Sequence, residues 1–178
     1  MNPHTAQPFG DQPVLTGLRA IVIKVLATGF GAGYSPMAPG TAGTITAALF
    51  YALVLRPWTL APYLVFLAFF IVLAILVAGR AEPLYGKRDA SFITIDEWAG
   101  FFVTMAPAVG VRSGVGSLAA AGFVAFRVFD VLKPWPAGWI DRLKNGGASV
   151  VLDDVAAGLY AAAIVGALRA TGWLTAWP

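Results

Sequence analysis

The sequence predicts an all-α protein, a polytopic membrane helical bundle with about four to five membrane-embedded segments and an N-terminal amphipathic helix. Of its 178 residues, 58% are hydrophobic and only 12% are charged, whereas soluble domains carry about a quarter charged residues. The mean hydropathy is +0.75. The uncharged segment from Thr59 to Gly79 is long enough to cross about 30 Å of hydrocarbon as a helix.

The N-terminal residues differ from the rest of the chain. Residues 1–13 are polar and contain no Lys or Arg, so they do not resemble a signal peptide. We expect a disordered tail there, followed by one membrane domain over residues 14–170. At the start of that domain, the stretch 14–27 has apolar residues at helical spacing together with Arg19 and Lys24. This pattern predicts an amphipathic helix lying on the membrane surface.

Five apolar segments follow in order. Thr44–Leu55 and Thr59–Gly79 are separated by Arg-Pro-Trp and predict a helical hairpin. Trp98–Val111 and Gly114–Phe126 are each short for a full crossing, so they form either a tight pair of spans or a re-entrant hairpin. The last segment is Val155–Leu168.

The charged residues sort by side if the chain crosses at each of these segments. All of the acidic residues then fall on one face, with every Lys and Arg except Arg56, Arg112 and Arg169. The excess of Lys and Arg marks this face as cytoplasmic. The sorting predicts that any chemistry takes place there. If Thr44–Leu55 does not cross, the glycine-rich stretch before it moves to the other face.

Composition excludes several mechanisms. The chain has no cysteine, and its only histidine is His4 in the polar tail. Cysteine nucleophiles, histidine nucleophiles and histidine bases are therefore excluded. The net charge of +3 fits contact with anionic lipid and is too weak to indicate a nucleic-acid partner.

A glycine-rich stretch, "GFGAGYSPMAPGTAGT", occupies residues 29–44. One interpretation is a turn followed by a helix that Thr41 or Thr44 caps. The other is a backbone cradle for phosphate at the start of that helix. It is not a Walker loop, because no Gly-Lys-Ser/Thr follows.

Two acidic pairs each stand directly before an apolar segment: Asp96 with Glu97, and Asp153 with Asp154. Acids in a first helical turn complement the helix dipole, which is one explanation. The other is a metal site, because carboxylate oxygens suit Mg²⁺. Carboxylates at the border of hydrocarbon are costly and indicate function.

The third polar stretch is "FRVFDVLKPWPAGWIDRLKNGG". Asp130 and Lys133 share a helix face, and the helix should end before Pro134. Lys133 either neutralises the end of this helix or joins Arg127 or Arg142 in binding a phosphate.

Together these stretches resemble the phosphatidylglycerophosphatase A family of bacterial membrane enzymes. The matching segments span about residues 27–165: "GFGAGYSPMAPGTAGT", "SFITIDEWAGFFVTM", "FRVFDVLKPWPAGWIDR" and "GGASVVLDDVAAGLYAA". The resemblance implies a mostly helical fold and Mg²⁺-dependent hydrolysis of phosphatidylglycerophosphate to phosphatidylglycerol and phosphate, a step of phospholipid biosynthesis. It places the enzyme in the bacterial inner membrane, with an anionic lipid as its partner.

With this resemblance, we assign expected roles. Mg²⁺ is held by Asp96, Glu97, Asp153 and Asp154. The catalytic residues are Asp96, Glu97, Asp130, Lys133 and Asp154, with Asp130 either orienting Lys133 or joining the metal ligands. The substrate phosphate is bound by Ser35, Gly40, Thr41, Arg127 and Lys133. The nucleophile is either a metal-activated water or an aspartate.

Two other functions are weighed. A small transporter or ion-pathway protein should carry ionisable residues within its spans, where this sequence has few. A phospholipid headgroup transferase using a CDP-activated lipid needs a longer array of aspartates, which the sequence lacks.

Overall fold

The computed structural model describes residues 15–87 and 89–172, and within them every regular element is a helix. The α-helices are α1 (Gly17–Ala27), α2 (Pro39–Phe50), α3 (Leu60–Tyr85), α4 (Ile95–Met105), α5 (Val115–Leu132), α6 (Ala137–Leu143) and α7 (Gly147–Thr171). A π-helical turn, Tyr51–Leu55, continues α2, and short 3-10 turns cover Ala32–Tyr34 and Ala106–Ala108. The predicted all-α class is confirmed. The tail predicted for residues 1–13 lies outside the described residues.

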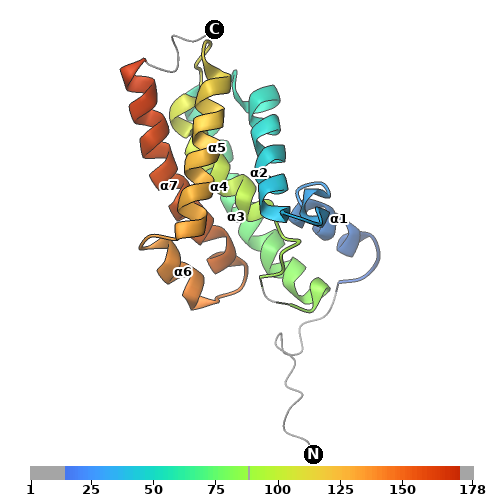
Figure 1. Cartoon of the computed structure of the whole chain (residues 1–178). Helices are drawn as coiled ribbons and strands as arrows, with labels where there is room; N and C mark the ends of the chain where they lie inside the picture. The colour runs from blue at the N-terminus through green and yellow to red at the C-terminus, as the bar shows by residue number, and fades with distance from the viewer. Residues whose placement is uncertain (1–14, 88, 173–178) are drawn as a thin grey trace, which may run out of the picture.

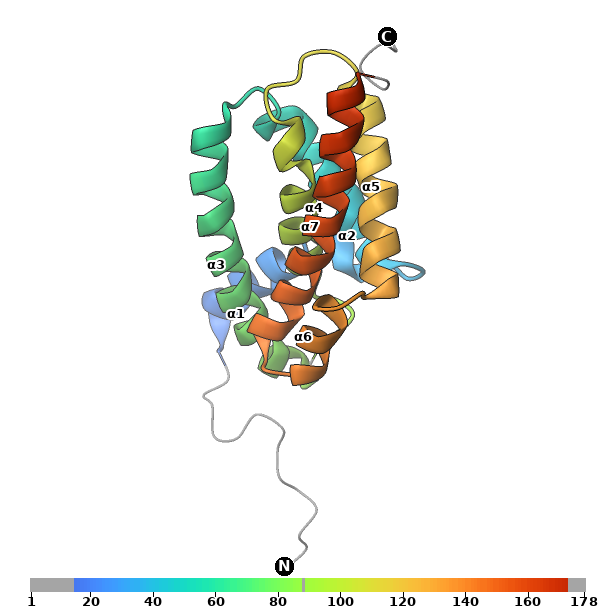
Figure 2. The same cartoon turned by 90° about the vertical axis from the view of Figure 1, so that its left-hand side faces the viewer.

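Helix α4 is the centre of the bundle. It packs against α2, α3, α5 and α7 and lies among them in both views (Figures 1 and 2). Every residue of α4 except Asp96 is buried, as expected for a helix that is apolar on all sides. At 11 residues, α4 is only about 16 Å long. It is therefore a short internal helix rather than a span.

The contact between α4 and α7 depends on two glycines. A Cβ atom on Gly100 of α4 would lie 2.7 Å from the carbonyl oxygen of Asp154, and one on Gly158 of α7 would lie 2.4 Å from the carbonyl oxygen of Gly100. Small residues let helix backbones approach this closely. Glu97 precedes Gly100 by about one turn and Asp154 precedes Gly158 by about one turn. The same contact therefore brings the two acidic pairs together.

Three helices are long and apolar enough to cross a membrane: α3, α5 and α7. The apolar helix Pro39–Leu55 is shorter. Helices α5 and α7 extend well beyond the apolar segments that predicted them, so Arg127, Asp130 and the pair Asp153–Asp154 lie within helices. The apolar runs mark only the lipid-facing and core-facing parts of each helix. The polar end of α5 stays helical because no helix-breaking residue comes before Pro134. The polar start of α7 stays helical because none follows Gly147 until the apolar segment begins.

Helix α1 confirms the helix predicted near the N-terminus. It packs against α3 and projects from one side of the bundle (Figure 1). Its apolar residues Leu18, Ile21, Val22 and Val25 are exposed. The apolar face therefore points away from the bundle, as an interfacial helix requires.

The two ends of the bundle carry different charges. Arg56, Arg112 and Arg169 gather at one end: Arg56 Nη2 donates to the carbonyl of Arg112 (3.0 Å), and Arg169 Nη1 donates to the carbonyl of Pro107. The first turns of α2, α4 and α7 lie at the opposite end, with the last turns of α3 and α5 (Figure 1). The separation of charges predicted from the sequence is present in the fold.

Candidate functional site

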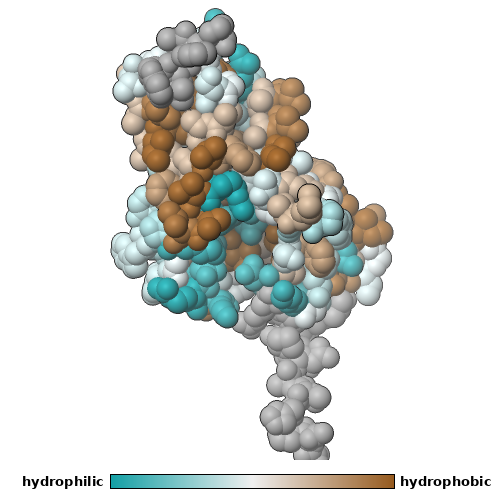
Figure 3. Space-filling model, in the orientation of Figure 1, coloured by the Kyte–Doolittle hydropathy of each residue, from teal (hydrophilic) through white to brown (hydrophobic). Residues whose placement is uncertain are grey.

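A polar cavity of about 490 Å³ opens at this second end of the bundle. Figure 3 shows hydrophilic residues around a hollow in the lower half of one face, with hydrophobic residues above them. Every Asp and Glu of residues 15–87 and 89–172 lines the cavity: Glu82, Asp89, Asp96, Glu97, Asp130, Asp141, Asp153 and Asp154. Its cations are Lys87, Arg127, Lys133 and Lys144. Such a concentration of charge indicates a functional site.

Helix α4 carries Asp96 and Glu97 in its first turn. The Glu97 amide donates to Asp96 Oδ1 (2.9 Å), and Asp96 has no ion pair with any described residue. Burial, followed by the negative charge of Glu97, raises the pKa of the Asp96 carboxyl well above its usual value. A nearby cation would act in the opposite direction on this pKa, because it favours the charged carboxylate.

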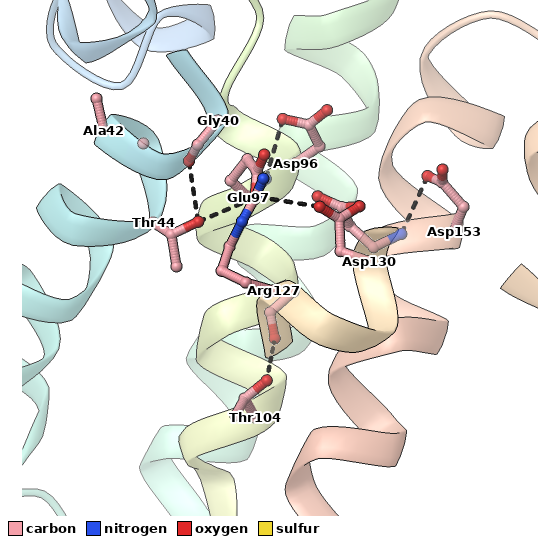
Figure 4. A network of polar contacts seen from close by, with 12 residues as sticks. Gly40, Ala42, Thr44, Asp96, Glu97, Thr104, Arg127, Asp130 and Asp153 are labelled. Atoms are coloured by element: carbon pink, nitrogen blue, oxygen red, sulfur yellow. Dashed lines mark hydrogen bonds and ion pairs between the residues drawn. The ribbon is translucent and has the colours of Figure 1, made fainter. Parts of the chain in front are cut away.

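Glu97 is the centre of an ion network. Arg127 Nη1 lies 2.5 Å from Glu97 Oε2 and 3.0 Å from Asp130 Oδ2 (Figure 4). The Thr44 hydroxyl lies 2.9 Å from Glu97 Oε2 and 2.9 Å from the carbonyl of Gly40, so its single proton serves one acceptor at a time. The network joins α2, α4 and α5, and it fixes the direction of the Arg127 guanidinium.

Pro39 and Gly40 are the residues of the glycine-rich stretch that line the cavity. A Cβ atom on Gly40 would lie 2.1 Å from Glu97 Oε1 and 3.3 Å from Arg127 Nη1, so only glycine lets α2 approach this network. Ser35 and Thr41 do not line the cavity. The predicted cap is wrong: Ala38 precedes α2 without a side-chain bond, and Thr41 and Thr44 lie inside the helix.

Lys133 directly follows α5, which ends before Pro134 as predicted. Its backbone turns into the left-handed region (φ 44°), and its Nζ donates to Asp141 Oδ1 (2.9 Å) and Asp153 Oδ2 (2.6 Å). Burial lowers the pKa of Lys133, but the hydrogen bonds to Asp153 and Asp141 outweigh it and raise the pKa above its usual value. The expected pairing of Asp130 with Lys133 is absent, because Asp130 pairs with Arg127.

Asp153 and Asp154 lie in the second turn of α7, since the helix begins at Gly147. The helix-dipole explanation therefore does not apply to them. Each is 5% exposed, and the Asp154 amide donates to Asp153 Oδ1 (3.0 Å). The Asp154 carboxylate forms no hydrogen bond or ion pair with the described part of the chain. Its electrostatic neighbours include the carboxylates of Asp96, Glu97, Asp130 and Asp153.

A buried carboxylate that faces other carboxylates is costly unless a cation compensates it. The donor set suits a hard divalent cation, which prefers carboxylate oxygens. The described residues nevertheless contain no group of three or more Asp, Glu, His or Cys side chains already placed to hold an ion. The unpartnered Asp154 is thus the observation that fits a metal, while a preformed set of ligands is not present.

Sequence reasoning missed several cavity residues. Glu82 is 4% exposed on α3, and its Oε1 accepts a bond from the amide of Asp89 (2.9 Å) in the following loop. Asp141 holds Lys133 from α6. Lys87, Lys144, Ser91 and Ser149 also line the cavity. Asp141 and Lys144 lie in the third polar stretch, where no role was assigned to them, and the only signal for Glu82 and Lys87 was their common side of the membrane.

Comparison with known proteins identifies the family of this chain. The family model described as Phosphatidylglycerophosphatase A matches residues 25–169. The Phosphatidylglycerophosphatase A of Escherichia coli K12 is 36% identical over 142 residues, covering 79% of this chain and 80% of that protein. The Phosphatidylglycerophosphatase A of Haemophilus influenzae is 33% identical over 147 residues, covering 83% and 88%.

A Bacteroides thetaiotaomicron protein with the provisional name phosphatidylinositol-3-phosphatase is 34% identical over 152 residues, covering 82% of this chain and 92% of that protein. No solved structure matches the chain. The family match covers all of the cavity residues described above. The chain therefore belongs to the phosphatidylglycerophosphatase A family of lipid phosphatases.

Proposed function

We propose that the protein hydrolyses the terminal phosphate of phosphatidylglycerophosphate, releasing phosphatidylglycerol and inorganic phosphate. The observation that carries the proposal is the single cavity that gathers every described acid together with Arg127 and Lys133. The reaction takes place in the bacterial inner membrane, with the cavity facing the cytoplasm. The excess of Lys and Arg at that end of the bundle supports this orientation.

Mg²⁺ is the proposed cofactor. Asp96 and Asp154 form no ion pair with any described residue and would be its first ligands. Glu97 and Asp153 complete the set from the same two helices, although each now pairs with a cation. When bound, Mg²⁺ supplies positive charge to phosphate oxygens and lowers the pKa of a bound water.

Arg127 and Lys133 bind the phosphate. Both heads are held by carboxylates before substrate arrives, Arg127 by Glu97 and Asp130, and Lys133 by Asp141 and Asp153. Such preorganised charge stabilises developing negative charge without reorganisation during the reaction. The first turn of α2 at Gly40 adds backbone N–H groups, because the first amides of a helix lack partners within it. Ser35 and Thr41 stay predicted contacts that would require this loop to shift.

Hydrolysis needs a nucleophile in line with the leaving lipid hydroxyl. A water activated beside Asp96 or Asp154 can supply it, or one of these carboxylates can attack phosphorus directly. In either route the phosphorus–oxygen bond to the lipid breaks and the lipid oxygen takes up a proton. In the carboxylate route, water must then hydrolyse the aspartyl phosphate, which releases inorganic phosphate and restores the carboxylate. Asp130 orients Arg127 for this step.

The test uses purified protein in mixed micelles. Phosphate release is measured from phosphatidylglycerophosphate, phosphatidic acid and a phosphorylated inositol lipid, each with Mg²⁺ or with a chelator. We expect release from phosphatidylglycerophosphate that requires Mg²⁺. Folded protein that releases no phosphate from any lipid would favour a transporter, while equal release with chelator would refute the metal.

A further inference from the structure

A second cavity, of about 220 Å³, lies beside the charged one. Its lining comes from α1 and the following loop, α2, α3 and α4, and it is almost wholly apolar: Leu26, Gly29, Phe30, Phe50, Phe66, Phe69, Phe70, Leu73, Ile95 and Trp98. Phe30 (68% exposed) and Phe69 (64% exposed) lie at its rim, whereas Ile95 and Trp98 form a buried floor. The cavity therefore opens at the surface of the bundle and ends against α4.

Two buried polar atoms close to Gly29, a lining residue of this cavity, have no partner among the described residues: Trp98 Nε1 and Thr94 Oγ1. Trp98 lines the cavity at 5% exposure, and Thr94 is fully buried at the start of α4. A buried donor without an acceptor destabilises the fold. Both groups can donate a hydrogen bond, so one acceptor placed between them would satisfy both.

Gly29 lets both donors approach its backbone closely. A Cβ atom on Gly29 would lie 2.6 Å from Trp98 Nε1 and 3.0 Å from Thr94 Oγ1, so any side chain there would cover both donors. Gly29 also adopts the left-handed region (φ 54°), which favours glycine. The first glycine of the glycine-rich stretch thus brings two donors together beside the cavity that it lines.

The two cavities share the first turn of α4. Asp96 and Glu97 line the charged cavity, while Ile95 and Trp98 line the apolar one. A helix with its side chains is about 10 Å across, so a ligand passing the start of α4 at Thr94 could reach both. Such a ligand has an anionic head, an uncharged acceptor next to it, and an apolar chain.

We propose that this apolar cavity binds an acyl chain of the lipid substrate, with its ester carbonyl accepting from Trp98 Nε1 and Thr94 Oγ1. This inference rests on the proposed function, because it assigns the second half of the same substrate. A dry apolar cavity of about 150 Å³ binds benzene, so this cavity holds the first part of one chain, and the remainder leaves past Phe69 toward lipid. The cavity makes the enzyme specific for acylated phosphate esters.

The experiment compares two substrates with the same phosphate ester: diacyl phosphatidylglycerophosphate in mixed micelles, and its deacylated, water-soluble form. Leu73→Phe fills the apolar cavity, and Leu76→Phe is the matched control, one turn along α3 at an exposed position outside the lining. We expect Leu73→Phe to raise KM for the lipid roughly ten-fold, as loss of about two buried methylene groups would. Its kcat/KM for the soluble substrate should not change, and Leu76→Phe should leave both substrates unaffected.

The polar end of the cavity is tested by Thr94→Val and Trp98→Phe. Each should raise KM for the lipid roughly five-fold, the effect of one lost hydrogen bond, without changing hydrolysis of the soluble substrate. Thr94→Val should also raise the melting temperature of lipid-free protein, because it removes an unpartnered buried hydroxyl. Lipid and soluble activities that fall together in these variants, or no change in either, would overturn the inference.

A binding measurement separates this inference from the proposed function. Diacyl phosphatidylglycerol should raise the melting temperature of wild-type protein in detergent and have less effect on Leu73→Phe than on Leu76→Phe. If the wild type hydrolyses neither substrate, but the lipid stabilises Leu76→Phe more than Leu73→Phe, the proposed function fails and the acyl-chain site stands. If the lipid stabilises both variants equally, the site is refuted whatever the enzyme hydrolyses.

Discussion

The two ends of the bundle use charge in opposite ways. At one end, the side chains of Arg56 and Arg169 donate to the backbone carbonyls of Arg112 and Pro107. At the other end, Arg127 and Lys133 donate to carboxylates, and Asp96 and Asp154 form no ion pair in the described part of the chain. In the first arrangement, the two arginine side chains have backbone carbonyls as acceptors. The second contains uncompensated negative charge, and its cations are aimed into a cavity.

The difference separates structural charge from functional charge. A side chain that satisfies a carbonyl near a helix end stabilises the fold and needs no ligand. A buried carboxylate without a partner destabilises the fold, and proteins retain such groups where function requires them. The contrast predicts that substitutions at the cavity end change activity strongly, whereas those at the arginine end change mainly stability.

The largest effect is expected for Asp154→Asn. Loss of the unpartnered carboxylate should lower kcat on the order of 1,000-fold, as removal of one preorganised charge does. The same variant should melt at a higher temperature than wild type without Mg²⁺, because it removes a buried charge repelled by its neighbours. Phosphate release and thermal unfolding of one preparation test both. Full activity in this variant would remove Asp154 from the mechanism.

Lys133→Met should come second. It leaves Asp153, at 5% exposure, without its cation, and breaking a buried pair in this way costs about 3–5 kcal/mol of unfolding free energy. Phosphate release should fall roughly 100-fold as well, since a charge that contacts the phosphate is lost. Asp141→Asn is the control, because it removes the less buried partner and leaves the contact with Asp153. Equal losses in both variants would contradict the assigned role of Lys133.

Gly40→Ala at the cavity end is compared with Gly116→Ala at the arginine end. The added methyl group would press on Glu97 and Arg127, and activity should fall roughly ten-fold, an effect of about 1.4 kcal/mol. Gly116→Ala in α5 meets nothing within 4 Å. It should raise the unfolding free energy by up to about 1 kcal/mol, because alanine favours helix. Phosphate release and thermal melting of both variants measure the contrast, and equal activities would contradict it.

The smallest effect on activity is expected for Arg169→Gln at the arginine end. The variant loses the bond to the Pro107 carbonyl, which should lower the unfolding free energy by about 1 kcal/mol. Phosphate release should stay within about two-fold of wild type, since the substitution lies away from the cavity. Thermal melting and phosphate release distinguish the two ends, and a large loss of activity would break the comparison.

Prediction from sequence succeeded where the pattern is local. Apolar length predicted the long helix α3, helical spacing predicted α1, and Pro134 predicted the end of α5. Prediction failed at helix ends that no such sequence pattern marks. The start of α7 was placed after Asp153 and Asp154, although the helix begins at Gly147. Under one interpretation Thr41 or Thr44 would cap the helix, because a cap is recognised by residue type, whereas Pro39 at the first helical position had already begun α2.

The sequence by itself determined the helical membrane class, the side on which the charges gather, and the family. These follow from composition, apolar length and short motifs, which depend on neighbours in the chain. Only the tertiary structure decided the pairing of charges: Asp130 with Arg127, Lys133 with Asp141 and Asp153, and Asp154 with none. Packing decided this, because the approach of Gly100 to Gly158 places α4 against α7, and Lys133, in the left-handed turn after α5, reaches Asp141 of α6 and Asp153 of α7.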